Sequence, residues 1–349
     1  MSRDGFFARH LPRLWYLKRL APALWPLLPL AWLFRMIVAA RRGLYRLHLI
    51  RPVRLPVPVV VVGNLTVGGN GKTPLVLWLV DRLREQGWHP GVISRGYGGK
   101  SEEHALRVTA QSAVVEVGDE PLLLAKRSGV PVFVGRDRVA AGRALLSACP
   151  ECDVVISDDG LQHYRLARAA EIVVFDARGV GNGRLLPAGP LREPLARRAE
   201  ASAEVWNGGV PERHANAQVP PQFAMRLTGQ RFVRLGDEQR TCPAQALTGK
   251  NLHAVAGIGN PARFFAQLAA LGLEFAAHAF PDHYAYQAAD LAFAPDAVLL
   301  MTEKDAVKCA GLALPEAWVL PVDAHLDDAP DGRSLLDTIL EKLHGCPPA

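Results

Sequence analysis

Cysteine is scarce in this chain of 349 residues, and the arrangement of its five cysteines excludes two kinds of small stabilised domain. They are Cys149, Cys152, Cys242, Cys309 and Cys346. An odd number argues against a disulfide framework. The single CxxC pair, Cys149 and Cys152, lacks a second CxxC or HxxxH that would complete a four-ligand zinc site. We expect two ordinary thiols in a reduced cytosol, with a redox pair as the alternative.

Acidic residues are almost missing from the first 54 positions, and the chain also lacks internal repeats and low-complexity tracts. The first 54 residues contain ten arginines and one lysine but a single acid, Asp4, which gives a charge of +10. The whole chain carries +6, so the remainder carries −4. The length allows two domains or one large domain. The segregated charge predicts an acidic partner for the N-terminal arm (residues 1–50), either anionic lipid or nucleic acid.

Within this arm lies a long apolar segment. Residues 20–40 contain one charge, Arg35, and are long enough to cross a bilayer core. Tryptophan and tyrosine flank the segment, and no signal-peptide cleavage site follows it. Five basic residues on each side leave its orientation undecided, and three prolines would kink a straight helix. We expect a helix that lies in the cytoplasmic leaflet on anionic lipids. The alternatives are a spanning helix, a buried core helix and, least favoured, a nucleic-acid-binding arm.

A glycine-rich loop separates a predicted strand from a predicted helix. Residues 58–62 form a valine-rich run typical of a buried parallel strand, and apolar residues recur at helical spacing after Lys72. Backbone N–H groups of such a loop bind phosphates, a lysine reaches the β- and γ-phosphates, and a Ser/Thr hydroxyl ligates Mg²⁺. The predicted nucleotide-binding residues are Thr66, Val67, Gly68, Gly69, Asn70, Gly71, Lys72 and Thr73. Thr66 replaces the first glycine of the usual pattern, which leaves a chance Gly-Lys-Thr turn as the alternative.

Two carboxylates follow a second apolar strand. Residues 154–156 lead directly into Asp158 and Asp159, and His163 comes shortly after. Carboxylates at the carboxyl end of a strand beside a phosphate-binding loop hold Mg²⁺ in nucleotide-hydrolysing enzymes. The alternative is a simple strand-to-turn boundary, because Asp-Gly is a strong turn signal. With the loop upstream, we predict a magnesium site here with His163 beside it.

Eight motifs, in this order along most of the chain, resemble those of the lipid A 4'-kinase family, also called tetraacyldisaccharide 4'-kinases. The threonine at position 66 is part of that resemblance. The motifs are TVGGNGKTP, SRGYGG (Ser94–Gly99), GDEP (Gly118–Pro121), SDDGLQH (Ser157–His163), LLPAGPLRE (Leu185–Glu193), AVAGIGNPARFF (Ala254–Phe265), FPDHYAY (Phe280–Tyr286) and TEKDAVK (Thr302–Lys308).

The resemblance implies two α/β/α domains, the first P-loop NTPase-like, joined by a small β linker. It implies transfer of the γ-phosphate of ATP to the 4'-hydroxyl of a tetraacylated glucosamine disaccharide 1-phosphate, which gives lipid IV-A. It also implies ATP and Mg²⁺ as cofactors and a location at the cytoplasmic face of the inner membrane of Gram-negative bacteria.

The resemblance also implies roles for single residues. Asp119 of the GDEP motif is expected to be the base for the sugar hydroxyl, with His283 of FPDHYAY as its partner. Arg192 of PLRE is expected to stabilise charge on the transferring phosphate. Ser94 and Arg95 are candidate contacts to substrate or nucleotide.

The candidate magnesium ligands are Thr73, Asp158, Asp159 and Glu193. Structural roles are the alternatives elsewhere: a helix N-cap for the GDEP aspartate, a satisfied loop histidine in FPDHYAY, and a surface ion pair for Arg-Glu of PLRE.

Strands expected near 58–62, 91–94, 131–134, 153–157 and 172–175 alternate with helices, which predicts a mostly parallel sheet covered on both faces. Residues 223–227 and 231–235 predict a β hairpin. The expected division is the arm at 1–50, a P-loop kinase domain at 51–207, a β linker at 208–245 and a second α/β domain at 246–349. The last domain includes a C-terminal helix near 334–344.

Two other functions compete with a lipid kinase: a soluble P-loop GTPase or metallochaperone, and a membrane adaptor that only binds nucleotide. A guanine-specific GTPase would show N-K-x-D, whereas this chain has Glu303, Lys304 and Asp305 in sequence. The aspartate pair, the GDEP motif and the second-domain histidine disfavour a non-catalytic adaptor.

Overall fold

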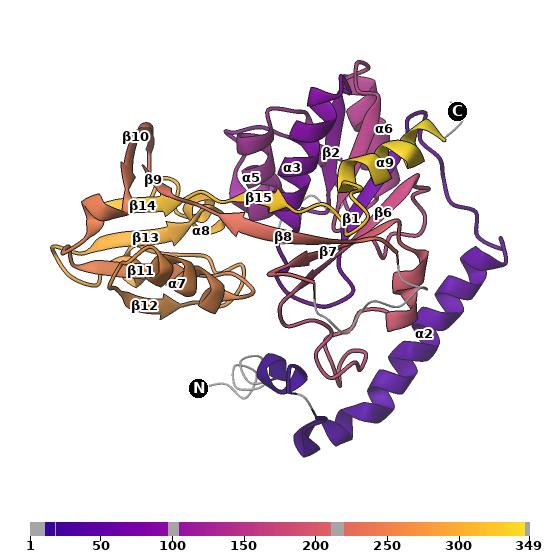
Figure 1. The fold of residues 1–349 in the computed structure, drawn as a ribbon, viewed down its shortest axis with the longest axis horizontal. Coiled ribbons are helices and arrows are strands. Elements are labelled where there is room, and N and C mark those ends of the chain that lie inside the picture. Colours follow the sequence, from indigo (N-terminus) through magenta and orange to yellow (C-terminus); the bar gives the residue numbers. More distant parts are fainter. Residues whose placement is uncertain (1–10, 18, 97–104, 211–219, 346–349) are drawn as a thin grey trace.

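The computed structural model describes residues 11–17, 19–96, 105–210 and 220–345, and Figure 1 shows two α/β bodies with a long helix beside the larger one. Part of the SRGYGG motif lies outside the described residues, as do Arg3, Arg9, Lys18 and Cys346. The described cysteines are all free thiols, and Cys149 and Cys152 are buried, which agrees with ordinary thiols.

Nine strands form the sheet of the larger body, in the order β15-β8-β7-β6-β1-β5-β2-β4-β3. Their bounds are β1 Val59–Gly63, β2 Pro90–Ser94, β3 Leu106–Val108, β4 Val132–Val134, β5 Val154–Asp158, β6 Ala170–Asp176, β7 Ala203–Asn207, β8 Gln222–Thr228 and β15 Asp323–Leu326. Neighbouring strands are parallel except at β3–β4 and β15–β8. The predicted mostly parallel sheet is confirmed.

Alternation of valines explains why β1 lies at the centre of this sheet. Val60 and Val62 belong to one hydrophobic core, and Val59 and Val61 belong to the core on the opposite face. A strand buried on both faces reads as a continuous apolar run. The helices α3 Lys72–Glu85, α4 Val114–Val117, α5 Asp119–Ser128 and α9 Leu335–His344 pack on the first core, and α6 Arg138–Ala148 packs on the second.

The smaller body has a six-stranded sheet in the order β10-β9-β14-β13-β11-β12. Its strands are β9 Arg231–Arg234, β10 Asp237–Pro243, β11 Leu252–Ala256, β12 Ala276–Ala279, β13 Val298–Thr302 and β14 Ala317–Leu320. The core on one face contains α7 Pro261–Ala270 and the short helix η4 Ala244–Leu247, and η5 Ala288–Leu291 and α8 Glu303–Lys308 contribute to the core on the other. The predicted pair of α/β units is therefore confirmed.

The predicted hairpin of 223–227 and 231–235 is wrong, because these strands belong to different sheets. β8 pairs with β7 and β15 in the larger body. β9 pairs with β10 and β14 in the smaller one. The hairpin partner of β9 is β10, and the segment between β8 and β9 crosses from one body to the other.

The end of the chain also lies elsewhere than the predicted 246–349 unit. β15 adds to the sheet of the larger body, and Leu335, Ile339 and Leu343 of α9 are buried in its first core. The chain therefore crosses back between the bodies after β14, and α9 packs on the larger body (Figure 1).

The N-terminal arm forms the short helix η1 Pro22–Leu27 and then α2 Leu28–Arg46. The prolines lie in η1 and the first turn of α2, where a missing N–H costs little, so the rest of α2 continues as a helix. Leu24 and Ala31 are the buried residues of these two helices, which contradicts the buried-core alternative. The stretch Pro22–Arg46 is long and apolar enough to cross a membrane.

Candidate active site

The phosphate-binding loop connects the carboxyl end of β1 to the N-terminus of α3, as predicted. Lys72 is the first residue of α3 and Gly71 is its N-cap, with a φ of 94°. A Cβ at Gly71 would lie 2.5 Å from the Nδ2 atom of Asn207. Only glycine fits this left-handed, crowded position. The loop therefore directs the free N–H groups of the first helical turn toward a bound anion.

Thr66 holds the loop together by its side chain. It is buried, and its Oγ1 accepts a hydrogen bond of 2.9 Å from Nδ2 of Asn70. The same Nδ2 donates to the carbonyl of Val174 on β6, and Asn207 donates to the carbonyl of Asn70. A glycine at position 66 could not make this contact, so the departure from the usual pattern has a structural reason.

Lys72 and Arg192 meet at one carboxylate. Nζ of Lys72 lies 3.5 Å from Oδ1 of Asp159, and Nη1 of Arg192 donates to both carboxylate oxygens at 3.1 and 3.0 Å. Burial opposes ionisation of Asp159, but Lys72 and Arg192 outweigh it and lower the pKa of this carboxyl. Asp159 also has a φ of 47°, an uncommon conformation for a non-glycine residue. Asp159 thus holds the cations of Lys72 and Arg192 next to the loop.

Asp158 lies under this cluster at the end of β5. It is fully buried, Oγ of Ser94 donates to its Oδ2 at 3.3 Å, and its Oδ1 has no hydrogen-bond partner among the described residues. Burial and the charge of Glu120 raise the pKa of Asp158 to about 7, although Lys72 opposes the shift. Nη2 of Arg138 donates to the Asp158 carbonyl at 3.4 Å. A buried carboxylate oxygen without a partner is suited to a cation.

Magnesium fits these oxygen donors only in part. Hydroxyl and carboxylate oxygens are the ligands that Mg²⁺ prefers, and the ion normally keeps waters and phosphate oxygens as well. Within the described ranges no three His, Cys, Asp or Glu side chains converge as a complete metal site. Asp158, Asp159 and Thr73 can therefore supply part of a coordination shell, with nucleotide phosphates and water as the remainder.

Asp119 is the first residue of α5, and it faces a histidine of the smaller body. Nδ1 of His283 lies 3.0 Å from each carboxylate oxygen of Asp119. Burial opposes the charge on Asp119, but the hydrogen bond from His283 and the charge of Lys304 lower its pKa. The same hydrogen bond raises the pKa of His283. His283 also has a positive φ, of 58°. The expected pair forms, between residues 164 positions apart.

Lys304 of the TEKD motif joins the two bodies beside this pair. Its Nζ lies 2.9 Å from Glu120, 3.1 Å from Asp282 and 3.9 Å from Asp119. Burial disfavours the ammonium, but the three carboxylates raise the pKa of Lys304 above its ordinary value. The motif was part of the family resemblance and counted against a GTPase, but the sequence did not predict this contact, because the partners are distant in sequence.

The two bodies enclose a cleft of about 130 Å³ at the loop. The loop residues 69–73 line it from the larger body, and Asn260, Arg263 and Gln267 line it from the smaller one. A Cβ on Gly259 would lie 2.4 Å from the backbone N of Gly69, so the two backbones touch. Nη1 of Arg263 is buried without an acceptor among the described residues. Its motif, AVAGIGNPARFF, was noted in the sequence, but its place beside the phosphate loop was not foreseen.

Two further contacts with the loop escaped sequence analysis. The Tyr16 hydroxyl of the N-terminal arm donates to the carbonyl of Val67 at 3.3 Å. The Arg178 guanidinium lies 4.7 Å from the Tyr16 ring centroid and donates to Asp176 and to the Gly259 carbonyl. No sequence motif marks these residues. They meet because the N-terminal arm lies against the carboxyl end of β6.

Three predicted residues lie apart from the Lys72–Asp159–Arg192 cluster. Glu193 is buried and its carboxylate contacts the Tyr164 hydroxyl and the Arg197 guanidinium. His163 faces Asp137 at 3.6 Å, and burial lowers its pKa to about 4. Arg95 is exposed at the end of β2.

The chain is similar to a group of named kinases along nearly its whole length. The family model for tetraacyldisaccharide-1-P 4'-kinase matches residues 23–341. The tetraacyldisaccharide 4'-kinase of Dechloromonas aromatica is 56% identical over 340 residues, which are 97% of this chain and 98% of the relative. That of Azoarcus sp. is 54% identical over 327 residues, 93% of each chain. The crystal structure of apo-form LpxK from Aquifex aeolicus in complex with ATP matches with a TM-score of 0.77 at 31% identity, covering 92% of this chain and 99% of the other.

Proposed function

This chain belongs to the tetraacyldisaccharide-1-P 4'-kinase family, and we propose that the cleft between its two bodies carries out that family's phosphoryl transfer. The protein is an ATP-dependent kinase of lipid A biosynthesis. Its acceptor is the 4'-hydroxyl of a tetraacylated glucosamine disaccharide 1-phosphate, and its product is lipid IV-A. The observation that supports the site best is the pairing of a P-loop lysine and Arg192 on Asp159, with the Asp119–His283 pair at the same cleft.

Nucleotide binding falls to the loop and its surroundings. Backbone N–H groups between Gly68 and Thr73 bind the phosphates, and Lys72 moves from Asp159 to the β- and γ-phosphates when ATP is present. Arg192 neutralises charge on the transferring phosphoryl group. Arg263, whose Nη1 has no acceptor in the described part of the chain, supplies a further cation from the smaller body.

Asp119 accepts the proton of the acceptor hydroxyl. The bond from the 4'-oxygen to the γ-phosphorus forms, the bond from that phosphorus to the bridging oxygen of ADP breaks, and the hydroxyl proton goes to the Asp119 carboxylate. A carboxylate with a lowered pKa is a weak base, but phosphoryl transfer has a loose transition state in which little proton transfer is needed early. His283 holds the carboxylate in place and keeps it ionised.

A magnesium ion bound with ATP would neutralise negative charge on the phosphates. We propose Asp158 and the Thr73 hydroxyl as its protein ligands, with Asp159 joining once nucleotide attracts Lys72 away. Glu193 was expected in this set, but its contacts with Tyr164 and Arg197 favour a supporting role for the Arg192 segment. Ser94 orients Asp158 through its hydroxyl.

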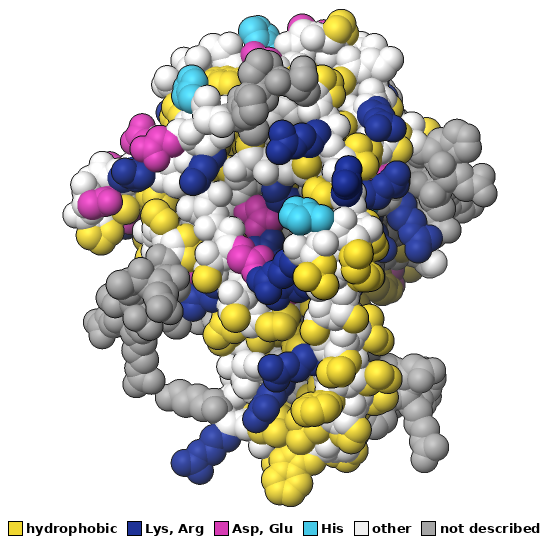
Figure 2. All heavy atoms as spheres, turned by 90° about the vertical axis from the view of Figure 1, so that its right-hand side faces the viewer, with side chains coloured by type: hydrophobic (Ala, Val, Ile, Leu, Met, Phe, Trp, Pro, Cys, Tyr) yellow, Lys and Arg dark blue, Asp and Glu magenta, His cyan; other side chains and the backbone are white. Residues whose placement is uncertain are grey.

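Docking of α2 on a membrane would bring the enzyme to its acylated acceptor. Apolar side chains of η1 and α2 are exposed to solvent: Trp25 60%, Leu30 54%, Trp32 70%, Leu33 59%, Met36 59% and Ile37 57%. Figure 2 shows hydrophobic side chains gathered at the lower end of one face, where α2 runs, below a belt of basic side chains. We propose attachment to the cytoplasmic leaflet of the inner membrane, where ATP is available and anionic lipids attract arginines.

The domain division proposed from sequence is kept in outline: the arm at 1–50, the kinase body from 51, a crossing segment within 208–245 and the second body from 246. β15 and α9 are assigned to the kinase body, because they pair and pack there.

The test of the activity is phosphate transfer from γ-labelled ATP to the acylated disaccharide 1-phosphate in mixed micelles. We expect label in the lipid with Mg²⁺ and none without it. Absence of lipid labelling, under conditions where ATP binding is measured directly, would refute the kinase assignment.

The test of docking uses vesicles. Replacing Trp32 and Met36 by glutamate puts charge on the exposed face of α2 and should abolish vesicle binding while micellar activity remains. The matched control is glutamate at Lys126 and Arg107, two exposed positions of the kinase body away from α2. Equal vesicle binding by the α2 variant and the control variant would contradict docking through this face.

A further inference from the structure

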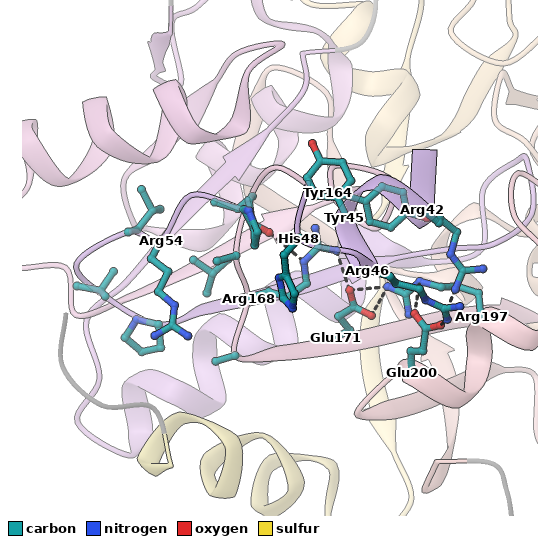
Figure 3. Close-up of a pocket in the computed structure, with 18 of the residues that line it drawn as sticks. Arg42, Tyr45, Arg46, His48, Arg54, Tyr164, Arg168, Glu171, Arg197 and Glu200 are labelled. Atoms are coloured by element: carbon teal, nitrogen blue, oxygen red, sulfur yellow. Dashed lines mark hydrogen bonds and ion pairs between the residues drawn. The ribbon is translucent and has the colours of Figure 1, made fainter. Parts of the chain in front are cut away.

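A second cavity, of about 450 Å³, lies between the C-terminal turn of α2 and the sheet. It is bounded by the last turn of α2, by the connecting segment 52–58 and by residues 164–169 before β6 (Figure 3). Val59 lines this cavity at the start of β1, whereas Gly63 at the other end of β1 leads into the phosphate loop. The strand separates the two by roughly 15 Å. The cavity is therefore not part of the active site.

Positive charge predominates in its lining. The charged side chains are five arginines and two glutamates, a net charge of +3 with His48 neutral: Arg42, Arg46, Arg54, Arg168, Arg197, Glu171 and Glu200. They come from α2, from the segment that follows it, from the start of β6 and the stretch that leads into it, and from the short helix η2 Leu195–Glu200, and all of them line this one cavity (Figure 3). Such a surplus of cations around a cavity favours an anionic ligand.

One buried arginine of this lining, Arg197, has an N–H group without a hydrogen-bond acceptor among the described residues. The side chain of Arg197 is 3% exposed, and its Nη2 donates to Glu171. The guanidinium is planar and rigid, unlike the flexible ammonium of a lysine. Its Nη1 has no acceptor among the described residues. Glu171 also accepts a bond of 2.7 Å from Arg168, and Nε of Arg197 lies 3.5 Å from Glu200 and 3.6 Å from Glu193. A buried N–H without an acceptor is destabilising, and a bound anion would relieve that cost.

In the outer part of the cavity, too, arginines outnumber carboxylates. Arg42 lies 2.5 Å from Glu200, and Arg46 contacts the same carboxylate oxygen. Arg54 has no carboxylate within ion-pair distance in the described part of the chain. In Figure 3 its guanidinium stands apart from both glutamates. Arg54 is thus an exposed cation at the cavity that no acid of the described residues neutralises.

The surroundings distinguish a lipid from a soluble phosphate. Directly after α2, three apolar side chains are exposed: Leu47 by 72%, Leu49 by 70% and Ile50 by 40%. They continue the exposed apolar face of α2 as far as the mouth of the cavity. An anion with acyl chains could place its charge among the arginines and its chains along these residues. A soluble phosphate would leave them in water.

We propose that this cavity binds the phosphate headgroup of an anionic membrane lipid, at a site distinct from the acceptor's. Arg54 binds the phosphate oxygens, the surplus positive charge of the lining attracts the anion, and Leu47 and Leu49 contact the acyl chains. The inference rests on the docking of α2 proposed above. It does not rest on the catalytic assignments.

The test compares two neighbouring arginines of the same segment. Arg54→Gln removes the unneutralised cation of the cavity, and Arg51→Gln removes an exposed arginine that does not line it. Full-length protein is bound to phosphatidylcholine vesicles with and without phosphatidylglycerol, and the gain in affinity is measured for each variant. Diffuse attraction is worth about 1 kcal/mol per basic residue, roughly fivefold, and should affect both variants equally.

We expect Arg54→Gln to lose at least threefold more of the gain than Arg51→Gln, with micellar kinase activity unchanged as the folding control. Equal losses overturn the site but leave docking intact. Absence of binding to any vesicle overturns docking itself. A third arm adds inorganic phosphate against sodium chloride of matched ionic strength. If phosphate alone abolishes the gain, the cavity takes soluble phosphate and the lipid assignment is wrong.

Discussion

The imidazole Nδ1 of His283 lies 3.0 Å from each carboxylate oxygen of Asp119, although the two residues belong to different bodies of the protein. Lys304 approaches the same carboxylate from the smaller body. The candidate base is thus ionised and oriented by groups that reach it only when the bodies face each other. Separation of the bodies would leave Asp119 without these partners.

The pH dependence of kcat/KM should report this contact. His283 lowers the pKa of Asp119 below 3.8, so the wild-type enzyme should keep an ionised base throughout the neutral range. In His283→Ala, burial still raises the pKa of Asp119 and its strongest opponent is gone, so the acidic limb of the profile should move to higher pH. Asp119→Asn should lower kcat by about 100-fold or more and leave KM for ATP nearly unchanged.

The double variant provides the control for this pair. If His283 acts through Asp119, the kinetic effects of His283→Ala and Asp119→Asn should not add fully in the double variant. The ion pair should also stabilise the fold, most strongly between pH 3.8 and 6.5. These limits are the ordinary pKa values of Asp119 and His283, which the two groups regain in the unfolded chain. Its contribution should decline as pH falls through the lowered pKa of Asp119 or rises through the raised pKa of His283. Fully additive kinetic losses would contradict a coupled pair.

Lys72 and Arg192 should contribute to transfer rather than to folding. Lys72→Ala removes the cation expected at the β- and γ-phosphates and should lower kcat by about 100- to 1,000-fold. Arg192→Ala should act in the same direction. The measurement is labelled-phosphate transfer by folded variants, with Lys126→Ala, an exposed lysine on α5, as the matched control. Near-normal turnover by Lys72→Ala would overturn the loop assignment.

Lys304 should be important for stability as well as for the site. Lys304→Met leaves the buried Asp119 and the partly exposed Glu120 and Asp282 without their shared cation, and losing such charged contacts costs about 1.5–3 kcal/mol. Thermal unfolding should therefore occur at a clearly lower temperature. Lys250→Met is the control, because Lys250 is exposed and its partner Glu316 is only half-buried, so this pair should matter by less than about 1 kcal/mol. Equal shifts in the two variants would contradict a special role for Lys304.

Tyr16 should couple the N-terminal arm to ATP binding. Tyr16→Phe removes the hydrogen bond to the Val67 carbonyl and should raise KM for ATP by roughly fivefold, the equivalent of about 1 kcal/mol. Tyr16→Ala also removes the ring beside Arg178 and should raise it further. Unchanged ATP binding in both variants would contradict a coupling of the arm to the phosphate loop.

Much of the larger body could be predicted from local sequence. The valine run before the loop, the left-handed Gly71 and the helix from Lys72 depend on neighbours in the chain, and backbone sterics fix them. The same holds for Asp158 and Asp159 at the end of β5, and for the exposed apolar face of α2. These features repeat with the period of a strand or a helix, or lie within a few residues of each other, so they can be recognised from the sequence.

Tertiary structure alone decided which side chains meet. The link from Lys304 to Glu120 spans 184 positions, and that from Tyr16 to Val67 depends on how the arm returns to the loop. Sequence misread the segment around β8 and β9 as a hairpin, since alternation identifies strands but not their sheet. The arginine-lined cavity is likewise invisible in sequence, where its residues look like separate solvated charges. Charge, burial and unsatisfied N–H groups acquire meaning only once packing brings them around one space.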